Sequence, residues 1–220
     1  MSKQQLRSQL SGVLSVISHS DILAQSEVIK DRLGRILEGK RDVACYMSMD
    51  EGEVDTGSII ETLFSQGKRV YLPRCTTTKR TGQVPLRYSV DNPETVKHHP
   101  HLTFHEMKTL DEVKQLTKQG KYGLKEPLIE DEKLSPLPPH LDVILVPGVA
   151  FTAGCARLGH GAGYYDDFFK RYALQHQGTA PLLVGISLKQ QIIDKIPMDA
   201  HDRYMDCVVA GDGSLYCHKI

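Results

Sequence analysis

The chain has 220 residues, of which 27 are basic and 27 acidic, so its formal net charge at pH 7 is zero. General nucleic-acid and membrane-surface binders carry a basic excess, and this composition argues against both classes. No apolar stretch approaches the roughly 20 residues that cross a bilayer. We therefore expect neither nucleic-acid nor membrane partners.

The length suits one substantial core, which predicts a single domain over residues 1–220, although length alone also permits two small domains. We separately expect a monomer. The cysteines form an odd set without a C-x-x-C pair. This pattern favours free thiols in a reducing compartment over a zinc site. The five cysteines are Cys45, Cys75, Cys155, Cys207 and Cys217.

Apolar residues at intervals of three and four predict amphipathic helices over Lys3–Ile17 and Asp21–Leu37, with Asp21 as the N-cap of the second. Two runs rich in β-branched residues follow, at Val43–Met47 and Arg69–Leu72. Between them, residues Thr56–Gln66 predict a helix that Gly67 ends. These elements form a strand, helix, strand unit.

The segment Val84–Val90 predicts a further strand. The next segment, Asn92–His140, is punctuated by prolines and predicts a long surface loop that folds over a ligand. It carries a cluster of histidines whose spacing does not match a metal site, so we expect solvated loop side chains. These histidines are His98, His99, His101 and His105.

Short apolar runs predict the remaining strands, and aromatic residues at helical spacing predict a helix over Tyr164–Tyr172. Alternating strands and helices favour an α/β fold with a mainly parallel sheet and helices on both faces. The predicted strands are Leu141–Val146, Leu182–Ser187, Cys207–Ala210 and Ser214–His218.

A glycine run joins the strand at Leu141–Val146 to the following helix. Gly159, Gly161 and Gly163 alternate with other residues, so the backbone can adopt positive φ and approach an anion. The helix N-terminus adds positive potential, and Arg157 adds a charge. The spacing matches neither the dinucleotide fingerprint nor a Walker A loop, so the run predicts a phosphate site or, alternatively, a flexible turn.

The string PGVAFTAGCARLGHGAGYYD, over Pro147–Asp166, resembles the signature of the 5-formyltetrahydrofolate cyclo-ligase family, also called 5,10-methenyltetrahydrofolate synthetase. In that family a PG-x-AF element precedes RLG-x-G-x-GYYD. The resemblance covers nearly the whole chain, because further segments fall in family order. They are the EVDT that ends Tyr46–Thr56, the YLPR of Tyr71–Arg74, the YGLKEP of Tyr122–Pro127 and the IPMDAHD of Ile196–Asp202.

The resemblance implies an ATP- and Mg²⁺-dependent ligase that forms a C–N bond. ATP would phosphorylate the formyl oxygen of 5-formyltetrahydrofolate, nitrogen 10 would attack the activated carbon, and 5,10-methenyltetrahydrofolate, ADP and phosphate would leave. Phosphoryl transfer depends mainly on positioning and charge neutralisation, so we expect no protein nucleophile and no catalytic residue in that sense.

The resemblance also implies the ATP site. Lys3 and Arg7 lie four residues apart, so a helix presents both on one face. Without the resemblance they would be solvated charges. The other expected ATP-binding residues are Arg157, Leu158, Gly159, His160, Gly161, Ala162, Gly163, Tyr164 and Tyr165.

Magnesium is expected at Asp166 and Asp202, because Mg²⁺ takes one or two carboxylates together with phosphate oxygens and water. The alternatives are a helix-terminus charge for Asp166 and a turn residue for Asp202. Asp167 is expected to be a surface charge.

For the folate, Glu53 follows an apolar run at the end of a predicted strand, where ligands bind in open α/β sheets. Its carboxylate can accept hydrogen bonds from the amino-pyrimidine ring. The alternative is a loop charge. Met47 and Tyr122 are expected to pack on the ring system or, alternatively, to belong to the core. His160, Gly161, Ala162, Gly163 and Tyr164 are expected to border the folate as well.

Departures from common family versions are modest: His160 and Ala162 fill the variable places of the glycine run, and Thr152 and Ala153 stand where an acidic residue often follows the phenylalanine. Two other functions stay open, a sugar-phosphate isomerase-like or acyl-transfer enzyme and a non-catalytic folate-binding protein. Residues Met1–Ser20 lack acidic side chains, which also describes a mitochondrial transit peptide. We expect a retained helix in a cytoplasmic protein.

Overall fold

The protein is an α/β structure built on one seven-stranded sheet, with strand order β11-β10-β9-β6-β1-β2-β3. The computed structural model describes residues 1–49, 52–83, 100–120, 123–129, 137–200 and 202–218. The predicted strand Val84–Val90, and also His98, His99 and Tyr122, lie outside the described residues. The strands of this sheet are β1 (Asp42–Ala44), β2 (Arg69–Thr77), β3 (Pro100–Met107), β6 (Val143–Val146), β9 (Leu182–Ser187), β10 (Cys207–Ala210) and β11 (Leu215–Cys217).

The five inner strands are parallel, while β3 and β11 pair antiparallel at the two edges. The inner strands β6 and β10 are apolar throughout, as expected for strands covered on both faces. The strands β1 and β2, with α3 (Gly57–Ser65) between them, form the predicted strand, helix, strand unit. After β3 the chain crosses back, and β6 pairs with β1 on the side opposite to β2. From β6 onward, strands are added in the other direction, so the strand order reverses between β1 and β6.

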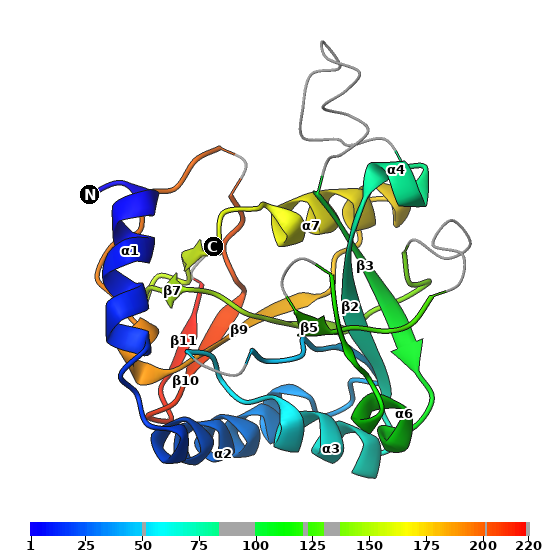
Figure 1. Ribbon diagram of the computed structural model, residues 1–220, viewed down its shortest axis with the longest axis horizontal. Helices are drawn as coiled ribbons and strands as arrows, with labels where there is room; N and C mark the ends of the chain where they lie inside the picture. Colours follow the sequence, from blue (N-terminus) through cyan, green and yellow to red (C-terminus); the bar gives the residue numbers. More distant parts are fainter. Residues whose placement is uncertain (50–51, 84–99, 121–122, 130–136, 201, 219–220) are drawn as a thin grey trace.

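Helices cover both faces, which confirms the predicted fold class. One face of the sheet packs against α2 (His19–Ile36), α3 and α6 (Leu110–Lys114) through a cluster that includes Ile29, Ile60 and Val113. The other face packs against α7 (Tyr164–Gln175) through Phe168 and Tyr172. Figure 1 shows α2 and α3 below the sheet and α7 above it.

A third apolar cluster positions the N-terminal helix α1 (Lys3–Leu14). Its Leu10 packs with Ala150 and Leu158 of a two-stranded hairpin, β7 (Ala150–Phe151) and β8 (Arg157–Leu158), and with Ile196. The remaining short elements are α4 (Thr78–Thr81), β4 (Lys118–Gln119), β5 (Leu124–Lys125) and the 3-10 helix η1 (Lys189–Gln191). None of the helices in the described part of the chain combines the length and apolar character needed to cross a bilayer.

Several sequence-based boundaries were wrong: the first helix ends at Leu14 rather than Ile17, the strand predicted as Arg69–Leu72 continues to Thr77, and two further boundaries have local reasons. The N-cap of α2 is Ser18, whose hydroxyl accepts the N–H of Asp21, and Asp21 instead lies in the first helical turn. The strand β1 ends at Ala44 rather than Met47, because the Tyr46 carbonyl turns to the hydroxyl of Thr56 at 2.8 Å. That hydroxyl also accepts the N–H of Ser48, so the chain beyond β1 becomes a loop.

The prediction of one long surface loop over Asn92–His140 was wrong at its centre. Residues Pro100–Met107 form edge strand β3 along the full length of β2. His101 and His105 are therefore buried in the sheet rather than solvated, and the Nε2 atom of His105 lies 2.8 Å from the Thr103 hydroxyl.

Asp167 is not the surface charge that was predicted. Its side chain is fully buried, and Arg171 donates from Nε to Oδ2 at 2.7 Å. Arg171 also donates to the Leu102 carbonyl at 2.6 Å, and the His101 ring lies 3.9 Å from Oδ2. The ion pair lies within α7 and holds Arg171 in place, and the hydrogen bond from Arg171 to the Leu102 carbonyl connects α7 to β3. Removing one partner of a buried ion pair destabilises the folded protein, because the other charge stays buried without a counter-charge.

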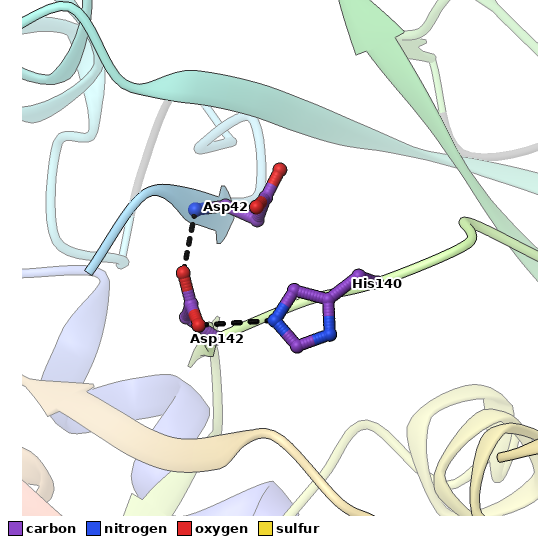
Figure 2. A group of neighbouring side chains, drawn as sticks. All are labelled: Asp42, His140 and Asp142. Carbon is purple, nitrogen blue, oxygen red and sulfur yellow. Dashed lines mark hydrogen bonds and ion pairs between the residues drawn. The ribbon is translucent and has the colours of Figure 1, made fainter.

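At the amino ends of β1 and β6, Asp142 holds the two strands together (Figure 2). Its Oδ2 atom accepts the backbone N–H groups of Arg41 at 2.7 Å and Asp42 at 2.9 Å, and its Oδ1 atom lies 3.0 Å from His140 Nε2. Burial opposes the charge, but these two N–H groups and His140 lower the pKa of Asp142 to about 2. The Asp42 carboxylate is itself paired with Arg69 at 2.5 Å, so the cluster is a structural link.

We expect Asp142→Asn to lower the Tm at pH 7 by about 2–4 °C, equivalent to roughly 1 kcal/mol. Because the folded pKa lies below the usual 3.8, the stabilisation is present above pH 3.8 and is lost as the pH falls toward 2. Thermal unfolding of both proteins across this range measures the difference. His140→Ala, which removes only the exposed partner, is the control and should cost less. Equal Tm values at pH 7 would show that Asp142 contributes nothing.

Candidate functional site

A cavity of about 350 Å³ opens at the carboxyl ends of β1 and β6. Tyr46 and Met47 follow β1, and Pro147 follows β6, and all three line the cavity. This is the place where the strand order reverses, which is the usual ligand position in open α/β sheets. The structure brings fifteen of the predicted site residues to this cavity, while Tyr122 lies outside the described residues. They are Lys3, Arg7, Met47, Glu53, Arg157, Leu158, Gly159, His160, Gly161, Ala162, Gly163, Tyr164, Tyr165, Asp166 and Asp202.

The glycine loop forms one wall of the cavity and leads into α7. Gly161 and Gly163 have φ of +101° and +73°, as predicted for a run that must adopt the left-handed region, and Gly163 is the N-cap of α7. At Gly159 the constraint is different, because a Cβ atom there would lie 3.0 Å from Nη1 of Arg157 and the guanidinium would have to shift. A side chain at Gly161 would likewise approach the guanidinium of Arg7 at 3.3 Å.

Arg157 is a buried guanidinium beneath this loop. Nη2 donates to Asp166 Oδ2 at 2.9 Å, and Nη1 donates to the Pro147 carbonyl at 3.2 Å. Nε is buried and has no hydrogen-bond partner in the part of the chain that the structure describes. The guanidinium carbon lies 5.5 Å from the centre of the Tyr165 ring. Asp166, in the first turn of α7, is thus held in the cavity by a salt bridge.

The helix α1 presents two cations to the same cavity. A capping box between Ser2 and Gln5 stabilises the start of the helix. Arg7 Nε donates to the Gly159 carbonyl at 2.8 Å. Lys3 Nζ pairs with Asp202 and, at 2.6 Å, with Asp199. Burial opposes the charge on Lys3, but both carboxylates raise its pKa above 10.5.

Glu53 faces the loop from the β1 side. Its Oε2 atom accepts the N–H of Met49 at 3.0 Å, and its Oε1 atom lies 4.0 Å from Nε2 of His160. Burial raises the pKa of Glu53 from 4.5 to about 7, and the Met49 N–H opposes this shift. Burial, together with Arg157 and Arg7, lowers the pKa of His160. Glu53 is therefore a carboxyl group in which the neutral and charged forms are balanced near neutral pH.

Sequence reasoning missed several lining residues, notably Tyr46, Cys75, Glu126 and Asp199. Glu126 is buried and accepts the N–H of Cys75 at 2.9 Å. Asp199 donates its N–H to Asp202 at 2.7 Å and so shapes the loop around Lys3. Glu126 and Asp199 both stand within segments, YGLKEP and IPMDAHD, that the sequence had already singled out, which is the signal that could have found them.

A parallel sheet with a cavity at its switch point, lined by a glycine loop and four Lys and Arg side chains, defines a class of α/β proteins that bind anionic small molecules. Comparison with known proteins narrows the class. Residues 1–211 match the 5-formyltetrahydrofolate cyclo-ligase family. The 5-formyltetrahydrofolate cyclo-ligase of Saccharomyces cerevisiae is 48% identical over 219 residues, covering 97% of each chain. The corresponding protein of Mus musculus is 28% identical over 215 residues, covering 96% of this chain and 94% of that one.

A solved structure agrees with the sequence matches. The 5,10-methenyltetrahydrofolate synthetase of Aquifex aeolicus covers 100% of this chain and 94% of its own, with a TM-score of 0.71 at 25% identity. The chain therefore belongs to the 5-formyltetrahydrofolate cyclo-ligase family, a family of ligases, as the sequence motifs predicted.

Proposed function

We propose that this protein catalyses the ATP-dependent cyclisation of 5-formyltetrahydrofolate to 5,10-methenyltetrahydrofolate. The observation that carries the proposal is the composition of the cavity: cations and a glycine loop form one side, and the buried Glu53 faces them. The first side suits a polyphosphate, and the second suits an amino-pyrimidine ring. Membership of the family supports this function over an isomerase or acyl-transfer enzyme.

The ATP phosphates would lie along Gly159–Gly163. Lys3 and Arg7 would approach them from α1, and Arg157 would contact them from beneath the loop. A planar guanidinium and an ammonium both stabilise phosphate charge, the first with fixed geometry and the second as a point charge. These cations contact Asp166, Asp199, Asp202 and the Gly159 carbonyl, and phosphate oxygens would accept from the N–H donors that these contacts do not use.

Asp166 and Asp202 would hold magnesium. The donor set fits this ion, because both residues supply carboxylate oxygens, the hard ligands that Mg²⁺ prefers, and both line the cavity beside the cations. Bound Mg²⁺ would neutralise phosphate charge during transfer. Arg157 and Lys3 would orient these two carboxylates through their ion pairs.

The folate would bind with its amino-pyrimidine ring at Glu53, whose charged carboxylate accepts the N–H donors of that ring. Met47 and Tyr164 also line the cavity and would pack on the ring. The formyl group would then face the γ-phosphate. Its oxygen takes the phosphoryl group, nitrogen 10 attacks the carbon, and the C–O bond breaks as phosphate leaves. The protein contributes position and charge, with no covalent intermediate on a side chain.

The test is a spectrophotometric assay of methenyl formation with 5-formyltetrahydrofolate, ATP and Mg²⁺, each omitted in turn. We expect product only in the complete mixture. Folate binding without product in that mixture would indicate a non-catalytic folate-binding protein. Turnover of a sugar phosphate without folate would contradict the proposal and would indicate an isomerase-like enzyme.

We expect Lys3→Gln to raise the KM for ATP about 10-fold with little change in the KM for the folate, because the variant loses one charge-assisted contact to phosphate. Steady-state kinetics with each substrate varied in turn separate the two constants. Gln4→Ala, an exposed position on the same helix, is the matched control and should leave both unchanged. An unchanged KM for ATP in Lys3→Gln would show that Lys3 does not bind ATP.

A further inference from the structure

The hairpin of β10 and β11 places two cysteines directly opposite each other. Cys207 is the register partner of Cys217. Two other residue pairs of the hairpin are joined by backbone hydrogen bonds. The N–H of His218 donates to the Asp206 carbonyl at 2.9 Å, and at the other end of β10 the N–H of Ala210 donates to the Ser214 carbonyl at 2.9 Å. Antiparallel pairs alternate between hydrogen-bonded and non-hydrogen-bonded types, so counting inward from both bonds makes Cys207 and Cys217 a non-hydrogen-bonded pair.

This pair type has the geometry that a disulfide requires. Opposite residues of a non-hydrogen-bonded pair have Cα atoms about 4.5 Å apart and side chains on the same face of the sheet. Disulfides usually span Cα separations of about 4.4–6.8 Å. A bond between Cys207 and Cys217 therefore needs no large backbone movement. Both residues are free thiols in the structure.

The two thiols differ in their access to solvent. Cys217 is exposed on edge strand β11, whereas Cys207 is 7% exposed on the neighbouring strand. Cys217 is therefore the thiol of the pair that peroxide in solution can reach directly. An exposed cysteine beside a second thiol is the arrangement in which a first oxidation is captured as a disulfide.

We propose that Cys217 is a peroxide-oxidised site and that Cys207 is its resolving cysteine, so that the β10–β11 hairpin closes a reversible cross-strand disulfide. In the first step the Cys217 thiol reduces hydrogen peroxide, which yields a sulfenic acid and one water. In the second step the Cys207 sulfur attacks the sulfenic sulfur. The S–S bond forms, the S–O bond breaks, and the hydroxyl leaves with the Cys207 proton as a second water.

Two features make the site separate from the proposed ligase activity. Neither cysteine lines the cavity, and Cys217 lies beyond residues 1–211, which match the family. A third thiol lies close by: Cys155 donates from Sγ to the Tyr216 carbonyl at 3.5 Å. Cys155 is thus a competing partner for Cys217, and the experiment must distinguish the two.

The test uses the reduced full-length protein, treated with hydrogen peroxide, alkylated, digested without reductant and mapped by mass spectrometry. We expect a peptide pair joined through Cys207 and Cys217, three of the five cysteines still alkylated, and restoration of all five by dithiothreitol. In Cys207→Ser, dimedone should trap the sulfenic acid at Cys217. Cys155→Ser is the matched control and should form the same disulfide as the parent protein.

Three results would overturn the inference. They are a Cys155–Cys217 linkage in the parent protein, a dimedone adduct at Cys217 with Cys207 present and no disulfide, and a Cys217 that stays alkylatable throughout. Cys217→Ser, at an exposed position, should remove the linked peptide without unfolding the protein. Circular dichroism of each variant before oxidation checks that the hairpin is folded.

Discussion

Glu53→Gln is expected to lower kcat/KM for 5-formyltetrahydrofolate about 100-fold while raising the free energy of unfolding at pH 8. The activity falls because an amide cannot replace the carboxylate as an acceptor of two N–H donors, and hydrogen bonds to a charged group contribute about 1.5–3 kcal/mol each. The stability rises because a buried charge is removed. A pKa of about 7 in place of 4.5 corresponds to roughly 3 kcal/mol of cost to the ionised form.

The sign of the pH dependence follows from the raised pKa. In the unfolded chain Glu53 ionises near pH 4.5, but in the folded protein it stays neutral until about pH 7, so the parent protein loses stability as the pH rises between these values. Urea unfolding should therefore give similar stability for parent and variant at pH 4.5, and a separation that grows up to pH 7 and then stays constant. Equal stability at pH 8 would show that the carboxyl group is not desolvated.

Activity is expected to rise with pH over the range in which stability falls. Because the folate needs the charged form, kcat/KM for 5-formyltetrahydrofolate in the parent protein should fall as the pH drops below about 7. Among the described residues, His160 lies 4.0 Å from Glu53, and Tyr46 and Tyr165 interact with its charge. His160→Ala should therefore leave the fall in place. A profile that is flat below pH 7 would contradict the assignment of Glu53 to the folate.

Asp166→Asn is expected to lower kcat about 1,000-fold, equivalent to roughly 4 kcal/mol of transition-state stabilisation. The variant loses a proposed magnesium ligand and the charged partner of Arg157. The free energy of unfolding should fall less, by about 1–3 kcal/mol, because the amide oxygen still accepts a hydrogen bond from the guanidinium. Kinetics across a magnesium titration, together with urea unfolding, measure the two effects separately.

The matched control for Asp166→Asn is Asp21→Asn. Asp21 also lies in the first turn of a helix, but it is exposed and far in sequence from the glycine loop. If Asp166 acted only on the helix dipole, the two variants would each lose about 0.3–1 kcal/mol of stability and would keep their activity. Full activity of Asp166→Asn at limiting magnesium would show that Asp166 is not a magnesium ligand.

Local patterns predicted much of the fold. The strand β9 and the strand β10 fall on the predicted residues, and the unit from β1 to β2 was correct in order and type. Such elements are visible because a buried parallel strand is a short run of apolar β-branched residues with turn residues at its ends. The glycine loop was predicted for a similar reason, since Gly161 and Gly163 adopt the positive φ that few other residues tolerate.

The parts that sequence reasoning missed depend on distant partners. The Lys3–Asp199 ion pair joins residues 196 positions apart, and the burial of Asp167 depends on Arg171 and on the strand β3. The strand β3 itself was obscured by histidines and prolines that are typical of loops. Charge pairing of this kind is set by packing, so a sequence pattern shows the charges without showing which of them meet.

The most direct test of the proposed function follows the formyl oxygen. The protein is incubated with ATP, Mg²⁺ and 5-formyltetrahydrofolate that carries ¹⁸O in the formyl group, and the released phosphate is analysed by mass spectrometry. If ATP phosphorylates the formyl oxygen in the cavity between the glycine loop and Glu53, each methenyl product formed should leave one ¹⁸O atom in inorganic phosphate. Methenyl product accompanied by unlabelled phosphate would contradict the proposed mechanism.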